Sequence, residues 1–138
     1  MARLMALDLG ENRIGIAVTD VDQTMAFPDR VLTRRSAKAD RQTLAALARE
    51  LAVDGVVIGL PLSMAGECGP HAERSKSFGA YLSRVLPVPV AYQDERLTTV
   101  EAEARLRETG LGPLERKNRI DAAAAAIILE DYMREHPL

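Results

Sequence analysis

Four acidic residues, Asp8, Asp94, Glu95 and Asp121, have sequence contexts in which a carboxylate could do chemistry. Asp8 interrupts an apolar run typical of a central strand, where an ionised carboxylate is disfavoured unless a cation or hydrogen bonds compensate it. Carboxylate oxygens favour Mg²⁺ or Mn²⁺ over Zn²⁺. A pair of such ions suits the attack of water on a phosphodiester bond, so these residues indicate metal-dependent hydrolysis of nucleic acid.

The elements that must position these carboxylates can be predicted from hydrophobic periodicity. The predicted strands cover residues 4–9, 14–18, 24–33, 56–58 and 88–92, and the predicted helices begin at Ala37, Pro70, Thr98 and Arg119. The first three strands form an antiparallel meander, and the last two lie parallel to the first through right-handed crossovers. We therefore predict an α/β fold with a five-stranded mixed sheet flanked by helices, in which residues 1–138 form one domain.

Local signals refine this outline. Residues 10–13, with the sequence GENR, supply Gly and Asn for the positive-φ positions of a tight hairpin, and Pro28 marks the third strand as an edge strand. Thr98 and Glu101 form a predicted capping box, with Leu97 as its hydrophobic staple. The basic stretch 111–119 is expected to be a flexible connection before the last helix.

This topology predicts that the acidic residues converge. The carboxyl ends of parallel strands share one edge of a sheet, so Asp8, at the end of the first strand, should face Asp94 and Glu95, just past the fifth. Asp121 opens the last predicted helix, whose small side chains allow a close approach to the sheet. The sheet-facing positions expected there are Ala122, Ala124, Ala125 and Ile128. Three carboxylates in one crevice would repel one another, and a divalent cation relieves that repulsion.

Structural explanations for the same residues remain open. Asp8 could cap its own turn, and Asp121 could compensate the dipole at a helix N-terminus. His71 is interpreted as a helix-start residue and the lone Cys68 as a small loop residue, because neither has an obvious catalytic partner.

Composition restricts the function classes. The net charge is −2 and aromatic residues make up 4%, which argues against a base-stacking platform and against binding by a global positive field. Binding of nucleic acid must then rely on metal ions or on local patches, and the basic residues could form such a rim or simply solvated helix faces. The rim candidates are Arg74, Lys76, Arg84, Arg116, Lys117 and Arg119. With no signal peptide or membrane-spanning run, we expect a soluble, cytoplasmic protein.

Four ordered motifs resemble the YqgF/RuvX family of Holliday-junction-resolvase-like proteins, which have an RNase H-like fold. They are ALDLGENRIGIAVTD (6–20), VVIGLPLSMAGECG (56–69), DERLTT (94–99) and RIDAAAAAIIL (119–129). The resemblance implies a metal-dependent nuclease that matures the 5′ end of the small-subunit ribosomal RNA precursor, cleaves branched DNA, or does both. A ribosomal subunit is then a candidate partner, and cleavage of a two-fold symmetric junction would favour a homodimer.

The family's motifs also imply roles for individual residues. Its catalytic and metal-binding acids correspond to Asp8, Glu95 and Asp121. Arg13 and Arg96 match its RIG and DER motifs, so either could approach a phosphate or pair with a neighbouring carboxylate.

Two other functions compete with this one. A non-catalytic module that binds structured nucleic acid could hold a metal in the same acidic site for structural reasons. Actin-like and sugar-kinase ATPases also begin with an Asp-x-Gly strand, but they need two lobes, and this chain of 138 residues has no second Asp-x-Gly hairpin.

Overall fold

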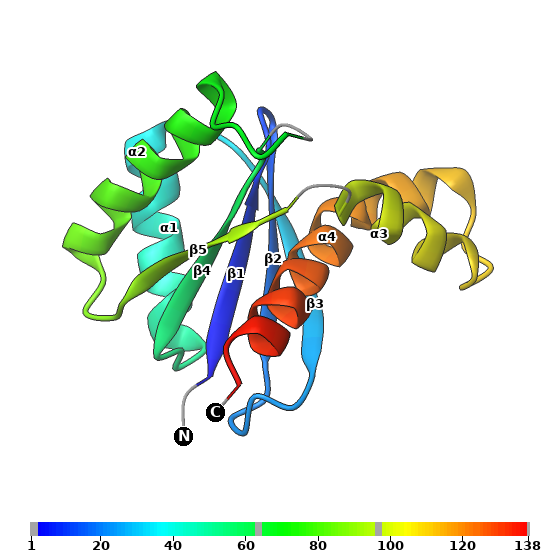
Figure 1. Ribbon diagram of the computed structural model, residues 1–138, viewed down its shortest axis with the longest axis horizontal. Helices are drawn as coiled ribbons and strands as arrows, with labels where there is room; N and C mark the ends of the chain where they lie inside the picture. Colours follow the sequence, from blue (N-terminus) through cyan, green and yellow to red (C-terminus); the bar gives the residue numbers. More distant parts are fainter. Residues whose placement is uncertain (1–2, 63–64, 96–97, 138) are drawn as a thin grey trace.

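The computed structural model describes residues 3–62, 65–95 and 98–137, which form a mixed sheet covered by helices on both faces (Figure 1). The elements in chain order are β1 (Leu4–Leu9), β2 (Arg13–Thr19), β3 (Ala26–Thr33), α1 (Ala37–Glu50), β4 (Gly55–Leu60), α2 (Pro70–Val85), β5 (Val90–Asp94), α3 (Thr98–Arg107) and α4 (Pro113–Glu135). None of the helices in these ranges is long and apolar enough to cross a membrane.

The sheet has the predicted topology. Its strand order is β3-β2-β1-β4-β5, with β2 antiparallel to both β1 and β3 and with β4 parallel to both β1 and β5. β3 is an edge strand, as Pro28 indicated. Its pairing with β2 shifts between Ile16 and Ala17, which lie opposite Arg30 and Pro28. The expected fold class is therefore confirmed.

The two faces of the sheet pack against different helices (Figure 1). In β1, Met5, Leu7 and Leu9 enter the core formed with α1 and α2, whereas Ala6 packs against α4. Side chains alternate along a strand, so Asp8 belongs to the face that α4 covers. The same alternation places Gly15 of β2 on that face, directly opposite Asp8 in the β1–β2 pairing.

The last helix differs most from the sequence prediction. α4 begins at Pro113, so the basic stretch is helical and Asp121 lies in the third turn rather than at the start. Pro113 occupies the first helical turn after Gly112, a favourable start that the basic composition obscured. The interpretation of Asp121 as a residue that compensates an N-terminal dipole is therefore wrong.

Smaller differences concern turns and helix ends. β5 begins two residues later than predicted and includes Gln93 and Asp94, because these residues pair with β4. The β1–β2 hairpin is present, but the prediction that Gly and Asn in residues 10–13 adopt positive φ is wrong. Among the described residues, positive φ occurs only at Gln23, Ala52, Gly66 and Gly110. Instead, the Gly10 amide donates to the carbonyl oxygen of Arg13 at 2.9 Å.

Thr98 does not form the predicted capping box with Glu101. Thr98 is the first residue of α3, and its hydroxyl donates to the carbonyl oxygen of Glu95 at 2.8 Å. The proposed staple, Leu97, lies outside the described residues. The start of α3 is thus tied directly to Glu95.

Of the four small or apolar residues expected to face the sheet, Ala125 and Ile128 pack on it with Ala6 and Val57. Ala124 instead packs against α3, in a cluster that includes Leu106. The alanine-rich helix therefore serves two interfaces, because α3 covers the side that the sheet does not.

Candidate active site

The close approach of α4 to the sheet depends on Gly15. A β-carbon added to Gly15 would lie 1.9 Å from the carbonyl oxygen of Asp121 and 2.8 Å from the amide nitrogen of Ala122. The helix backbone thus occupies the space that any other side chain would need. Because Gly15 pairs with Asp8, this contact brings Asp121 to the strand that carries Asp8.

A second glycine makes room for Glu95. A β-carbon added to Gly59 would lie 2.7 Å from Oε2 of Glu95 and 2.5 Å from Cδ1 of Ile128. The Glu95 amide donates to the carbonyl oxygen of Leu60 at 3.1 Å, which holds the residue beyond the end of β4. From there its side chain forms a hydrogen bond with the side chain of Asp8.

This contact changes the charge state of both acids. Burial raises the pKa of Asp8 to about 6, against the hydrogen bond from Glu95, which lowers it. Burial, followed by the charge of Asp8, raises the pKa of Glu95 to about 9. At neutral pH the proton is therefore on Glu95, which donates it to an ionised Asp8.

All three predicted acids face one cavity of about 350 Å³. Its wall contains Asp8, Glu95 and Asp121, together with His71 and the first residues of α3, Thr98 and Thr99. The sequence-based prediction that these acids lie at one crevice agrees with this arrangement.

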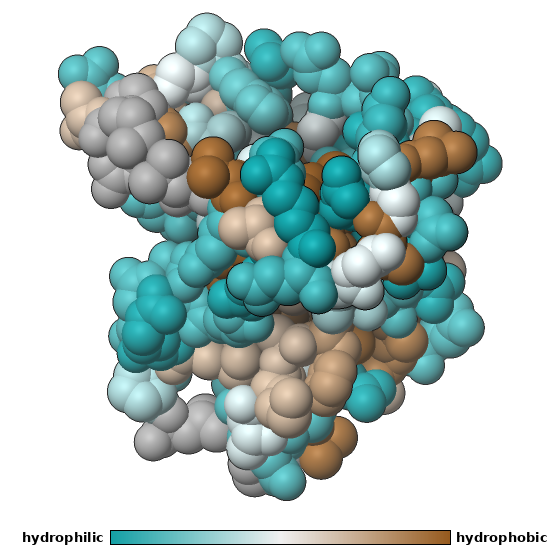
Figure 2. Space-filling model, turned by 90° about the vertical axis from the view of Figure 1, so that its right-hand side faces the viewer, coloured by the Kyte–Doolittle hydropathy of each residue, from teal (hydrophilic) through white to brown (hydrophobic). Residues whose placement is uncertain are grey.

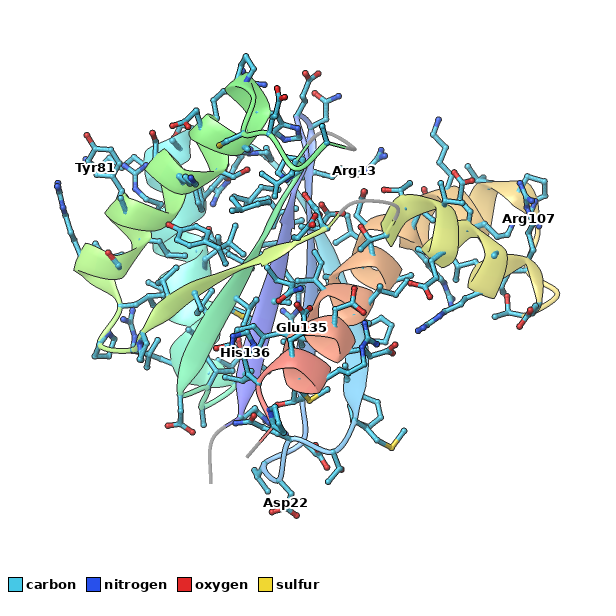
Figure 3. All side chains as sticks on the ribbon, viewed as in Figure 1. Arg13, Asp22, Tyr81, Arg107, Glu135 and His136 are labelled. Atoms are coloured by element: carbon cyan, nitrogen blue, oxygen red, sulfur yellow. The ribbon has the colours of Figure 1, made fainter. Side chains whose placement is uncertain are left out.

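Asp121 is already paired. Nε of Arg13 lies 2.7 Å from Oδ2 of Asp121, and the two side chains are 43% and 21% exposed. Figure 3 shows Arg13 near the β1–β2 hairpin. Of the two roles considered for Arg13, the structure shows the ion pair.

Among the described residues, no group of three His, Cys, Asp or Glu side chains is already arranged to hold a metal ion. Arg13 holds the third carboxylate, and Glu95 carries a proton. The donor set nevertheless fits a hard divalent cation, because all three acids offer oxygen ligands to one cavity and Asp8 and Glu95 are partly buried. Binding of the cation would release the Glu95 proton.

His71 is a residue of the site that sequence reasoning missed. It is the second residue of α2, as a helix-start residue should be, and its Nε2 lies 2.9 Å from the carbonyl oxygen of Leu9. Its charge lowers the pKa of Asp8. The available signal was positional, because α2 begins at the sheet edge that carries the acids.

The other predicted residues lie elsewhere or outside the description. Asp94 ends β5, and its charge adds to the raised pKa of Glu95. Lys117 lies in a hollow between α3 and α4, and Arg119 in another beside β3, so they do not share the acidic cavity. On the face of the molecule where α3 and α4 lie, hydrophilic side chains predominate in the upper half of the view (Figure 2). Arg96 lies outside the described residues.

Comparison with known proteins gives consistent results. The family model described as "RuvX: Holliday junction resolvase" matches residues 2–135. A protein of Chloroflexus aurantiacus named "Putative pre-16S rRNA nuclease" is 47% identical over 133 residues, which cover 94% of this chain and 85% of the relative. A protein of the same name from Anaeromyxobacter sp. is 44% identical, over 95% of this chain and 96% of the relative.

Solved structures agree on the fold. Thermus thermophilus RuvC in complex with a Holliday junction superposes with a TM-score of 0.64 at 15% identity, over 99% of this chain and 98% of that one. The fowlpox virus resolvase in complex with a Holliday junction superposes with a TM-score of 0.61 at 12% identity, over 99% of both chains. The fold is therefore the RuvC-like, RNase H-like fold.

Proposed function

This chain belongs to the RuvX family, and from that membership we propose that it is a metal-dependent endonuclease that hydrolyses phosphodiester bonds. The observation that carries the proposal is the convergence of Asp8, Glu95 and Asp121 on one cavity at the sheet edge. The names of the relatives support a nuclease, and the all-oxygen donor set supports its dependence on a divalent cation.

We assign the metal to these three carboxylates. When bound, Mg²⁺ or Mn²⁺, as one ion or a pair, supplies an activated water and stabilises the departing oxygen. The chain itself contributes the placement of the ligands. Gly15 seats the backbone of Asp121 against β2, and Gly59 leaves space for the Glu95 side chain.

The basic residues have a supporting role in this proposal. Arg13 is free to contact a phosphate once Asp121 turns to a cation. Arg96, Lys117 and Arg119 remain predicted contacts to nucleic acid. Lys117 and Arg119 line hollows other than the acidic cavity, so they suit flanking parts of a long substrate.

The substrate we favour is the small-subunit ribosomal RNA precursor, because the relatives at 44–47% identity are named pre-16S rRNA nucleases. The family resemblance adds that the cleavage belongs to maturation of the 5′ end of this precursor. Branched DNA is the second candidate, favoured by the full-length match to resolvase folds. The RNA reaction involves a ribosomal subunit as partner, whereas a four-way junction favours a homodimer. Both reactions place the protein in the cytoplasm.

The competing functions make different predictions. A non-catalytic binding module would bind these nucleic acids and leave them intact. An ATPase would bind ATP, and family membership favours the nuclease over it.

The test is cleavage of two substrates, a ribosomal RNA precursor with its 5′ extension and a four-way DNA junction, with Mg²⁺ or Mn²⁺. Asp8→Asn should keep its fold and lose cleavage, because it removes a charge from the acidic cavity at nearly constant volume. The matched control is Asp22→Asn, in an exposed loop at the far end of the molecule (Figure 3). Cleavage by Asp8→Asn at the wild-type rate would refute the ligand assignment, and binding without cleavage by the wild type would favour the binding module.

A further inference from the structure

A groove between α1 and α2 is larger than the acidic cavity. Its volume is about 410 Å³, and we call it the α1–α2 groove, after the helices whose side chains form its long walls. The residues that line it include Leu9, Gly10, Arg34, Arg41, His71, Arg74 and Tyr81. Figure 1 shows α1 and α2 side by side on the sheet face opposite α4.

The groove adjoins the acidic cavity. Leu9, Gly10 and His71 line both hollows, so the β1–β2 hairpin and the start of α2 form their common border. His71 is held at this border by its contact with the carbonyl oxygen of Leu9. A chain whose scissile phosphate lies at the acids can therefore reach the groove by crossing this border.

The charges in the groove suit a phosphate-bearing ligand. Arg34 is partly neutralised, because it pairs with the buried Asp40 at 3.3 Å. Arg41 and Arg74 form no ion pair within the described part of the chain, and they lie on opposite walls, in α1 and α2. The acids in the lining are the exposed Glu11 and Glu73.

An aromatic ring adds a second recognition element. Tyr81 is 51% exposed in a protein with few aromatic residues, and it points outward from α2 (Figure 3). The guanidinium of Arg41 lies 4.8 Å from the centre of its ring, and that of Arg84 lies 5.0 Å from it. Guanidinium planes and aromatic rings are the surfaces on which unpaired bases stack.

We propose that the α1–α2 groove binds an unpaired nucleotide of the cleaved strand, with its base against Tyr81 and Arg41 and its phosphate at Arg74. The volume is in the range of small-ligand pockets and too small for a duplex. The inference rests on the proposed function and narrows its substrate to nucleic acid that is single-stranded on one side of the cleavage point.

The test is binding of the full-length protein to three fluorescein-labelled probes in EDTA, which prevents cleavage. The probes are a 12-nucleotide RNA strand, a DNA strand of the same sequence, and the corresponding DNA duplex. The variants are Tyr81→Ala and the double variant Arg41→Ala/Arg74→Ala. The matched control is Arg49→Ala, an exposed arginine near the other end of α1.

We expect Tyr81→Ala to weaken single-strand binding about fivefold or more, since one stacked base contributes at least that much. The arginine double variant should weaken it further and flatten its dependence on salt, because it removes phosphate contacts. Duplex binding should change no more than it does in Arg49→Ala. A stronger effect on the RNA strand than on the DNA strand would identify RNA as the preferred source of the nucleotide.

Two results would overturn the inference. Equal losses for strand and duplex would mean that the groove contacts backbone without selecting an unpaired base, and losses no larger than those of Arg49→Ala would remove the groove from the binding surface. Either result, with cleavage by the wild type intact, leaves the proposed nuclease standing. A wild type that binds none of these probes and that, with Mg²⁺ or Mn²⁺, cleaves neither the ribosomal RNA precursor nor the four-way junction would instead refute the proposed function.

Discussion

Replacing Gly15 with alanine should separate α4 from the sheet. The added carbon would lie 1.9 Å from the Asp121 carbonyl oxygen, about 1.5 Å closer than the 3.4 Å at which ordinary contacts begin. The colliding atoms belong to helix backbone, so the helix must shift as a body. Overpacking typically costs about 1–3 kcal/mol, and a clash with backbone should cost the upper value, about 3 kcal/mol, or a fall in Tm of roughly 10 °C.

The same shift should damage catalysis more than folding. A misplacement of about 1 Å can cost roughly 100-fold in rate, so cleavage by Gly15→Ala at 25 °C should fall by at least that factor. Thermal unfolding followed by circular dichroism and single-turnover cleavage measure the two effects. Gly69→Ala is the control, because nothing lies within 4 Å of its added carbon. A Gly15→Ala variant with the Tm and rate of the control would refute the account of how Asp121 is placed.

Three further substitutions test the electrostatics of the site. In metal-free protein, Glu95 should hold its proton up to about pH 9 when folded but lose it near pH 4.5 when unfolded, so wild-type stability should fall between these values as pH rises. Glu95→Gln should remove that decline. Urea unfolding from pH 5 to 9 in EDTA should therefore show the difference in free energy of unfolding between the two proteins changing with pH. A difference that stays constant over this range would contradict the raised pKa of Glu95. Arg13→Gln should tighten Mn²⁺ binding in calorimetry by freeing Asp121, at a cost of at most about 1 kcal/mol in stability; weaker binding would mean that Arg13 does not compete with the cation. Gly59→Ala should weaken Mn²⁺ binding by displacing the Glu95 side chain, with little change in Tm because Ile128 can also yield; unchanged Mn²⁺ affinity would show that this space is not needed.

The strands and most helices could be predicted because their signals are local. The apolar run around Asp8, the edge position marked by Pro28 and the helix start at Pro70 each depend on residues within a few positions. The topology followed from the rules that govern connections between strands, and these rules were enough to place Asp8 and Glu95 at one sheet edge. The alanine-rich pattern of the last predicted helix brought in Asp121 as the third acid, and the family motifs then ranked these three above Asp94.

The start of α4 is where the local signals misled the prediction most. Pro113 carries the same helix-start signal as Pro70, but the basic residues after it suggested a flexible connection. The consequence was that Asp121 was placed at a helix start instead of in a helix interior.

Only the tertiary structure decided how the acids meet. The Asp121 backbone packs closely on Gly15, and the Glu95 side chain packs beside Gly59. These contacts join residues far apart in the chain, so local periodicity cannot predict them. The charge states depend on the same contacts, because burial and the proximity of Asp8 move the Glu95 proton. The sequence by itself therefore determined which acids meet and at which sheet edge, whereas long-range packing decided their spacing, their protonation and the pairing of Asp121 with Arg13.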